Sequence, residues 1–295
     1  MFERVIAPIL FVFIWSTGFV VAGGVAGLVD PNLFLTLRFA AVALILGLVA
    51  IALRQPLPDV ATAFKLMFIG LFMFALYLGP GYWVVAQGMS VGVITLIATL
   101  QPPMTAFLSA RIYDEPISFS LIAGLILGIS GVGLAVWPTL TVGELGGTSP
   151  WHVAVAFGSV LSLTIGTLMQ KASTASVPLV TANCWQKIGG ALGVGVAAIL
   201  MGESNVTVTP QSAFSYGWAV LVLSIAGMSL MVWMLRRGHA TRFTALFFPV
   251  APLAAIQGWL LFGETLSHLQ MVGFALTVIG VVLAHRMPGR SAKSA

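Results

Sequence analysis

The feature that most constrains the fold of this chain is a series of ten apolar runs, each long enough to cross a lipid bilayer as a helix. A helix needs about 20 apolar residues to span the hydrocarbon core. The runs cover Val5–Ala26, Asn32–Leu53, Phe64–Val85, Val93–Ile112, Phe119–Trp137, Val153–Gln170, Leu179–Met201, Phe214–Leu235, Phe243–Phe262 and Leu269–His285. The sequence therefore predicts an all-α, polytopic membrane protein with ten transmembrane helices.

The composition excludes a soluble domain and a membrane β-barrel. Asp, Glu, Lys and Arg make up 7% of the residues and the mean hydropathy is +1.06, whereas about a quarter of a soluble domain is charged. Barrel strands alternate apolar and polar residues, but these runs are continuously apolar, as helices that bond their own backbone in lipid can be. The isoelectric point near 9.8 comes from basic residues spread over short loops. We therefore expect a lipid bilayer, and no nucleic acid, as partner.

Lysine and arginine residues fall almost entirely on one side of the predicted membrane. The two chain ends and the loops on the N-terminal side carry eleven of the thirteen: Arg4, Arg54, Lys65, Arg111, Lys171, Arg236, Arg237, Arg242, Arg286, Arg290 and Lys293. The opposite loops carry no Lys or Arg and hold the acidic residues Asp30, Glu144, Glu203 and Glu264. Because cytoplasmic loops are enriched in Lys and Arg, we predict that both termini are cytoplasmic and that the number of spans is even.

The second half of the chain repeats features of the first. Glu115 and Glu264, Pro103 and Pro252, and Gly124 and Gly273 lie 149 residues apart, and Pro31 and Pro178 lie 147 residues apart. Five spans per half is an odd number, so the second half must cross the membrane in the opposite sense to the first. Inverted repeats of this kind are common in secondary transporters, with the substrate site near the midplane.

This repeat predicts the organisation of the chain. We expect two inverted five-helix repeats, residues 1–138 and 152–288, around a central cavity. An external linker, residues 139–151, would join them, and residues 289–295 would form a cytoplasmic tail.

Several short motifs in this arrangement resemble the EamA family of the drug/metabolite transporter superfamily. They are Trp15-Ser16-Thr17-Gly18-Phe19, Pro31 followed by Leu37-Arg38-Phe39, Pro102-Pro103, Asp114-Glu115-Pro116, Pro249-Val250-Ala251-Pro252 and Gly263-Glu264. The resemblance covers essentially the whole chain. It implies a basket of ten helices around a central cavity, lined by spans 1, 3, 4, 6, 8 and 9, and export of small metabolites, often amino acids. The halves differ at Arg38, because Trp185 stands at the corresponding position 147 residues later.

Two basic residues, Arg38 and Lys187, lie inside predicted spans, where ionisable groups are functional candidates. Arg38 is about 9 Å into its helix at 1.5 Å per residue. It can attract a substrate carboxylate; alternatively, it bonds backbone carbonyls or extends to the outer interface. Lys187 lies midway along its run, in a span that the resemblance places at the periphery.

Aromatic and neutral polar side chains inside the spans complete the candidate substrate-binding residues: Trp15, Ser16, Tyr77, Tyr82, Trp83, Thr99, Gln101, Ser162, Thr164, Trp185, Gln186, Trp233 and Gln257. A buried Trp or Tyr needs a partner for its polar atom, which a solute in a cavity can supply. For the polar residues, hydrogen bonds between helices are the alternative explanation.

Prolines and acidic residues recur at corresponding positions of the two halves. The prolines, which remove helical hydrogen bonds, are Pro102, Pro103, Pro249 and Pro252. Bent helices with free carbonyls are typical of a gated cavity; a static kink is the alternative. Glu115 and Glu264 each precede a helix, where the helix dipole favours a carboxylate, and we expect them to cap it.

Enzyme-like patterns are weak in this chain. Gly88–Gly92 matches the hydrolase G-x-S-x-G motif, but it joins two membrane helices rather than a strand and a helix. Glu264 and His268 lack the third ligand that a zinc site needs, and no phosphate-binding loop is present. We expect no catalysis, no metal and no cofactor.

These features favour a transporter that exports amino acids or related small metabolites across a bacterial inner membrane, by alternating access between the repeats and as a monomer. No carboxylate lies deep in any run, so we expect weak coupling or facilitated diffusion rather than tight proton antiport. The alternatives are transport of another solute class such as drugs or nucleotide precursors, an integral-membrane enzyme acting on lipid, and a non-catalytic scaffold.

Overall fold

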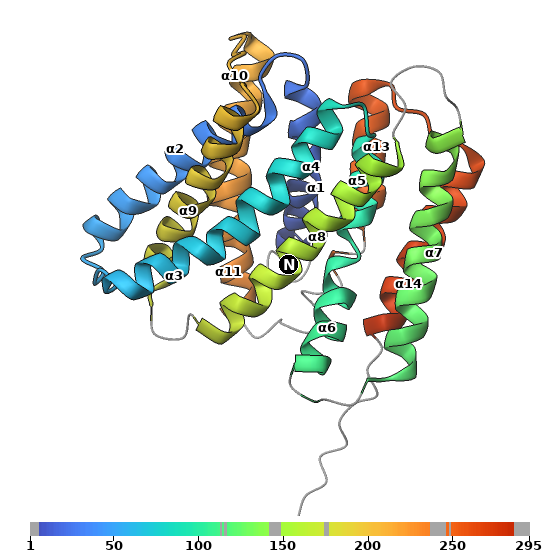
Figure 1. Ribbon diagram of the computed structural model, residues 1–295, viewed down its shortest axis with the longest axis horizontal. Helices are drawn as coiled ribbons and strands as arrows, with labels where there is room; N and C mark the ends of the chain where they lie inside the picture. Colours follow the sequence, from blue (N-terminus) through green and yellow to red (C-terminus); the bar gives the residue numbers. More distant parts are fainter. Residues whose placement is uncertain are drawn as a thin grey trace, which may run out of the picture.

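The structure, a computed structural model, describes residues 6–112, 114, 117–141, 149–173, 177–236, 246–247 and 249–285. These residues form a bundle of helices (Figure 1), and within them the only β-type pairing is an isolated bridge between Val29 and Val206. The all-α class is therefore confirmed. Glu115, Glu144 and most of the predicted linker and tail lie outside the described residues.

The helices follow the apolar runs. In the first half they are α1 Ala7–Val25, α2 Pro31–Ala52, α3 Val60–Gly70, the π-helix η2 Leu71–Ala75, α4 Leu76–Ala86, α5 Val91–Ala98, α6 Gln101–Ile112 and α7 Phe119–Thr141. In the second half they are α8 Pro150–Ser173, α9 Leu179–Leu200, α10 Pro210–Gly217, the π-helix η3 Trp218–Gly227, α11 Met228–Arg236, α13 Val250–Phe262 and α14 His268–His285.

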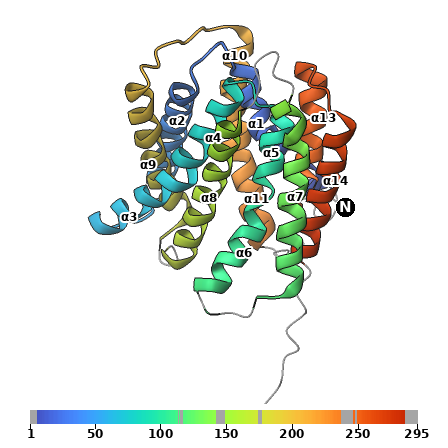
Figure 2. The same cartoon turned by 45° about the vertical axis from the view of Figure 1, so that its right-hand side comes forward.

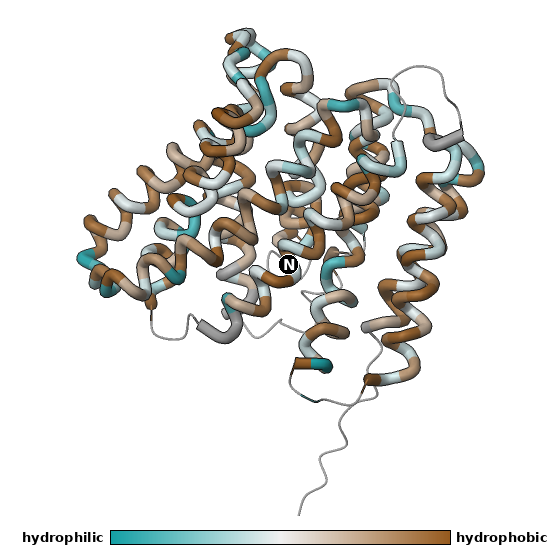
Figure 3. The backbone as a smooth tube through the Cα atoms, viewed as in Figure 1, coloured by the Kyte–Doolittle hydropathy of each residue, from teal (hydrophilic) through white to brown (hydrophobic). Residues whose placement is uncertain are grey.

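Seven helical segments are long and apolar enough to cross a membrane: Ala7–Val25, Pro31–Ala52, Val60–Ala86, Val91–Ile112, Phe119–Pro138, Pro150–Gln170 and Pro210–Met231. Two further apolar helices, Val250–Phe262 and His268–Ala284, are shorter. Helix α9 has 22 residues but carries Asn183, Gln186 and Lys187, which lower its hydropathy. Figure 3 shows hydrophobic residues along most of the length of the helices.

Helices from the two halves of the chain pair with one another. Helix α7 packs along α14, α2 along α9, and α5 against α13, and Figures 1 and 2 show α7 and α14 side by side at one edge of the bundle and α2 and α9 at the other. Glycines allow the α7–α14 contact to be close, as they do in many membrane helix pairs. A Cβ atom on Gly124 would overlap the backbone of Gly280, and one on Gly273 would overlap the backbone of Gly131.

A second close contact joins the end of α3 to α9. A Cβ atom on Gly70 would overlap the backbone carbonyl of Gln186, and one on Gly189 would overlap that of Met67. Gly189, Gly190 and Gly193 of α9 are therefore close-packing positions. This contact presses α9 against the span that contains η2.

The two π-helices occupy matching positions. η2 begins at Leu71 and η3 at Trp218, 147 residues later, which is the offset between Pro31 and Pro178. A π-helix replaces the regular hydrogen bonds of an α-helix and occurs frequently at functional sites. The apolar composition of these segments gives no hint of this change in winding.

Four connecting segments meet at one end of the bundle, which we call the bridged end: residues 26–30, 87–90, 201–209 and 263–267. Asp30 accepts hydrogen bonds from the backbone N–H groups of Ser204 and Asn205 at 2.9 and 2.8 Å. Glu203 accepts from Asn32 Nδ2 at 2.6 Å and from the backbone N–H of Leu33 at 2.9 Å. Carboxylates thus bind segments that are more than 160 residues apart in sequence.

Glu264 also stabilises the bridged end, but not in the way that its position suggests. Its Oε1 accepts from the backbone N–H of Val91 at 2.8 Å, so it caps α5 rather than α14, the helix that follows it. Burial raises the pKa of Glu264 above its ordinary value of 4.5, and the hydrogen bonds from the α5 backbone partly oppose that shift. The prediction of a capping role is correct in kind and wrong in partner.

Candidate functional site

Arg38 lies buried inside the bundle and joins several helices. It extends from α2, and its Nη1 donates to Tyr82 Oη on α4 at 3.1 Å. Its Nε and Nη2 both donate to Ser224 Oγ on η3 at 3.2 Å. Tyr82 in turn donates to the carbonyl of Gly18 on α1 at 2.9 Å. Arg38 thus links α2, α4 and η3 directly, and α1 through Tyr82.

Lys187, on α9, is also buried, with 4% of its side chain exposed. The face of α9 that carries it packs against α2 and α3, so the side chain points into the bundle although α9 lies at its edge. Its Nζ lies 3.2 Å from the ring centroid of Phe74 on η2 and 4.8 Å from that of Phe39 on α2. The guanidinium carbon of Arg38 lies 5.8 Å from the same Phe39 ring. We call Arg38 and Lys187 the cation pair.

No carboxylate faces the cation pair in the part of the chain that the structure describes. The acidic residues there are Asp30, Asp59, Asp114, Glu203 and Glu264, all at helix ends or in connecting segments. Lys187 Nζ makes no hydrogen bond to any described residue; its contacts are the two aromatic rings. A buried charge without a partner is costly, which makes this site unusual.

Aromatic rings surround the Arg38 side of the site. Tyr82 stacks on Phe34 at 6.0 Å and lies 6.2 Å from Phe19, and Tyr77 meets Phe19 edge-on at 6.0 Å. Tyr77 and Tyr82 therefore belong to one aromatic group. Trp218, the first residue of η3, donates from Nε1 to Thr17 Oγ1 at 2.9 Å, although its position at a span end suggests an interfacial role.

Two of the predicted tryptophans, Trp15 and Trp233, pack in an apolar cluster separate from the main core. Trp15 stacks on Phe11 at 5.1 Å and meets Phe247 edge-on at 5.8 Å. Trp233 belongs to the same apolar cluster. Trp185 is half-buried on α9. The candidate aromatic residues are thus divided among separate places in the bundle.

Most of the predicted polar residues bond backbone carbonyls. Ser16, Thr99 and Thr164 donate to carbonyls of their own helices, of Phe13, Leu96 and Val160 respectively. Ser162 donates to the carbonyl of Phe72 in η2 at 3.0 Å, and Gln101 joins α6 to α8 through Thr167 at 3.3 Å. Gln186 Nε2 and Gln257 Oε1 are buried and have no partner among the described residues.

The prolines lie at helix starts rather than in the middle of helices. Span 4 is interrupted at Thr99 and Leu100, between α5 and α6, and Pro102 and Pro103 lie in the first turn of α6. Pro249 is the N-cap of α13 and Pro252 lies in its first turn. A proline is tolerated in the first turn because its missing N–H has no intrahelical partner there. Span 4 is therefore interrupted directly before the proline pair.

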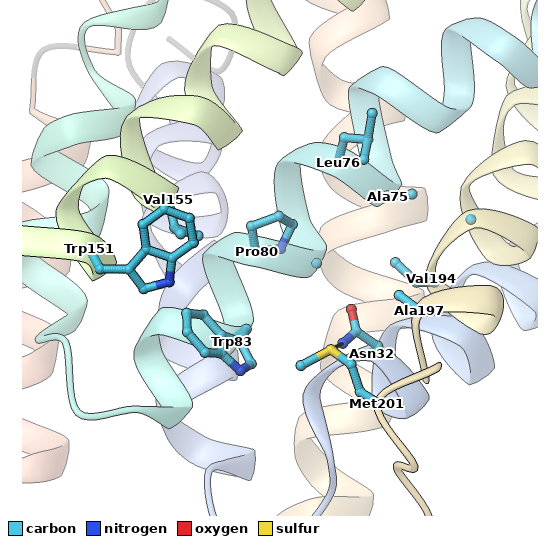
Figure 4. Close-up of a pocket in the computed structure, with 12 residues that line it drawn as sticks. Asn32, Ala75, Leu76, Pro80, Trp83, Trp151, Val155, Val194, Ala197 and Met201 are labelled. Atoms are coloured by element: carbon cyan, nitrogen blue, oxygen red, sulfur yellow. Dashed lines mark hydrogen bonds between the residues drawn. The ribbon is translucent and has the colours of Figure 1, made fainter. Parts of the chain in front are cut away.

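A cavity of about 340 Å³ opens between α4, α8, α9 and the start of α2. Figure 4 shows Trp83 and Pro80 of α4 near Trp151 and Val155 of α8, with Val194 and Ala197 of α9 and the adjoining Met201 on the other side. Its lining is almost wholly apolar. Among the residues that line it, Trp83 is the only predicted site residue. Asn32, its main polar residue, donates a hydrogen bond to Glu203.

Ser90, in the hydrolase-like motif, has a structural role. It is the N-cap of α5, and its Oγ accepts from the backbone N–H of Val93 at 3.1 Å. The described residues contain no group of three His, Cys, Asp or Glu that could hold a metal ion.

Sequence reasoning missed Ser224 and Phe74, the partners of the cation pair. A serine or a phenylalanine in an apolar run is too common to stand out. What the two residues share is a place in a π-helix, Phe74 in η2 and Ser224 in η3, and no sequence signal marks that place.

Comparison with known proteins identifies the family of the chain. The EamA-like transporter family matches residues 4–137 and 150–286. A WAT1-related chloroplastic protein of Arabidopsis thaliana is 26% identical, over 92% of this chain and 67% of that protein. The uncharacterized transporter YdfC of Bacillus subtilis is 25% identical, over 96% and 91%. The uncharacterized inner membrane transporter YedA of Escherichia coli K12 is 24% identical, over 92% and 86%.

The fold is also found among solved structures. A protein crystal structure of 18% sequence identity aligns with a TM-score of 0.63 over 95% of each chain. The family matches both halves of the sequence, and the helices in those halves are apolar enough to cross a membrane. The chain therefore belongs to the EamA-like transporter family and is a multi-span membrane transporter of small solutes.

Proposed function

We propose that this chain exports small metabolites, with amino acids as the first class to test, across a bacterial inner membrane by alternating access between two inverted five-helix repeats. The observation that carries the proposal is the reciprocal contact between α7 and α14, in which equivalent glycines of the two helices meet. Gly124 meets Gly280, and Gly273 meets Gly131; Gly273 and Gly280 are the counterparts of Gly124 and Gly131. Each helix therefore presents the same two positions to the other.

Two further observations support inverted repeats. The π-helices begin 147 residues apart, and the family matches two segments of nearly equal length. Alternating access in transporters with inverted repeats moves one unit against the other around a fixed site. The helix starts at Pro102-Pro103 and at Pro249 are the interruptions at which such a movement would bend the chain.

The bridged end is the external end under this proposal. Its segments carry Asp30, Glu203 and Glu264, whereas Lys and Arg predominate at the opposite ends of the helices. A single cysteine placed at Asn205 should react in intact cells with a membrane-impermeant maleimide, in a Cys184→Ala background. A cysteine at Asp114 should react only after the cells are opened. Equal reactivity of both positions in intact cells would contradict the inverted arrangement.

Transport itself is tested with the full chain in proteoliposomes. We expect efflux of at least one labelled solute from a panel of amino acids and organic acids, with and without a pH gradient. Because no described carboxylate lies deep in the bundle, the gradient should change the rate little. Strict dependence on the gradient would refute weak coupling, and no transport of any solute would refute the proposed function.

A further inference from the structure

We propose that the cation pair binds an oxyanion of the transported solute, so that the solute is a small organic anion carrying a carboxylate or a phosphate group. This proposal rests on the transport function proposed above and names its substrate class. It also chooses among amino acids, because it favours acidic over neutral and basic ones.

The first argument is a count of charged donors. A guanidinium has five N–H groups and an ammonium has three. Arg38 uses three, toward Tyr82 and Ser224, and Lys187 uses none toward the described residues. Both side chains are more than nine-tenths buried, at 6% and 4% exposure. With Lys187 protonated, five N–H groups of the cation pair therefore have no acceptor among the described residues, in a place where water is scarce.

The second argument is that the two cations share one site. Both lie within 6 Å of the centroid of the Phe39 ring, one from α2 and one from α9. A ring face attracts a cation but accepts no strong hydrogen bond from it. Phe39 and Phe74 therefore stabilise the positive charge of Lys187 without occupying its hydrogen-bond donors.

The third argument is the charge of the surroundings. The positive group of a zwitterionic or cationic solute would meet two basic side chains here, and the described carboxylates that could offset this repulsion all lie at helix ends or in connecting segments. An oxyanion instead offsets two like charges that repel each other. Arginine is suited to carboxylate and phosphate because its planar N–H groups match two oxygens at once.

The binding site can be tested without transport, because a ligand that binds only the folded state raises the thermal stability of the protein. We would follow thermal unfolding of the full chain in detergent, at constant ionic strength, with succinate, inorganic phosphate, glycine or choline. Succinate or phosphate should raise Tm in a dose-dependent way, and glycine and choline should not. The succinate and phosphate arms distinguish the two oxyanions.

Variants then assign the effect to the cation pair. Lys187→Met should require at least about tenfold more anion for the same Tm shift, the size expected when one charge of a buried pair is removed. Arg38→Lys keeps the positive charge and should weaken anion binding less than Lys187→Met does. It replaces variants that remove the charge of Arg38 if those do not fold. Lys65→Met and Arg111→Gln remove exposed charges and should leave the shift unchanged.

The outcomes separate the two proposals. If no anion shifts the Tm of the wild-type protein, or if the shift persists in Lys187→Met, the oxyanion site is wrong, whether or not the protein transports. If anions bind but only neutral or cationic solutes are transported, the substrate class is wrong and the transport function stands. If anions bind through the cation pair and nothing is transported, the anion site stands and the transport function fails.

Discussion

The two buried cations occupy similar places in the two halves of the molecule but are held in opposite ways. Arg38 leaves α2 and reaches η3, whereas Lys187 leaves α9 and reaches η2. Arg38 makes three hydrogen bonds; Lys187 makes contacts only with the rings of Phe39 and Phe74. The sequence repeat pairs Arg38 with Trp185, yet it is Lys187, two positions later, that contacts the π-helix.

Helix packing explains why one cation is bonded and the other is not. Beside Lys187, Gly70 and Gly189 bring α3 and α9 into backbone contact. At Gly217, the counterpart of Gly70, a Cβ atom would meet nothing within 4 Å. The Arg38 side is thus held together by a long side chain and the Lys187 side by glycines. On the Lys187 side the nearest groups to the amine are the rings of Phe39 and Phe74.

The largest difference between the two sides should appear when one methyl group is added at each of two matching positions, Gly70 and Gly217. Gly70→Ala should lower the free energy of unfolding by at least about 3 kcal/mol, because overpacking at a backbone contact cannot be relieved by a side chain. Gly217→Ala should raise it by up to about 1 kcal/mol, because alanine favours a helix over glycine. Denaturation of both variants in detergent, followed by tryptophan fluorescence, measures the difference. Equal costs would show that the two sides pack alike.

The next largest effect should come from removing each cation. Arg38→Met should lower the free energy of unfolding by about 2 kcal/mol, since three charge-assisted hydrogen bonds disappear and the relief of burying a charge only partly offsets them. Lys187→Met loses ring contacts worth about 1 kcal/mol but also an unpaired buried charge. Its stability without added anion should therefore be unchanged or higher. A loss as large as that of Arg38→Met would mean that Lys187 is also bonded.

A smaller effect is expected from the serines at the two π-helices. Ser224→Ala should cost about 1.5 kcal/mol, because it leaves two N–H groups of Arg38 without an acceptor. Ser162→Ala frees only the carbonyl of Phe72 in η2 and should cost about 1 kcal/mol or less. The comparison uses the same denaturation measurement, and the reverse order would show that Ser224 does not hold Arg38.

The bridged end repeats the contrast between paired and unpaired charge. Both oxygens of Glu203 accept hydrogen bonds, whereas Glu264 Oε2 is buried without a partner among the described residues. Because its folded pKa is raised above 4.5, the stability it contributes is present below pH 4.5 and is lost as the pH rises through that folded pKa. Glu264→Gln should remove this pH dependence, which amounts to less than about 1 kcal/mol in the free energy of unfolding. The Tm-against-pH curve should be correspondingly flatter. An unchanged curve would contradict the raised pKa.

The sequence predicts the helices well because one physical requirement, the burial of apolar runs in lipid, dominates this composition. The break near Pro102 was equally accessible, because proline is disfavoured in a helix interior and tolerated in a first turn. The π-helices were not, since Leu71–Ala75 and Trp218–Gly227 are as apolar as their α-helical neighbours. Their winding depends on packing against other helices.

The site was only partly predictable. Arg38, Tyr82 and Lys187 stand out as polar residues in apolar runs, and the structure brings them together. The others do not converge, since Trp15 and Trp233 lie in a separate cluster and Trp83 lines the apolar cavity. Which helix faces which is set by long-range contacts, such as that between Gly70 and Gln186, and these have no local signal. Glu264 shows the same limit, because it caps α5 across the fold.

The contact between α7 and α14 bears on how two halves of one chain can pack against each other. A contact in which both surfaces present the same positions is isologous, like the interface of a symmetric dimer. If the two halves are the inverted five-helix units proposed above, one such unit carrying these glycines would need only a second, oppositely inserted copy of itself to bury them. Each half thus buries the glycines of the other, and the same two positions are used on both sides of the contact.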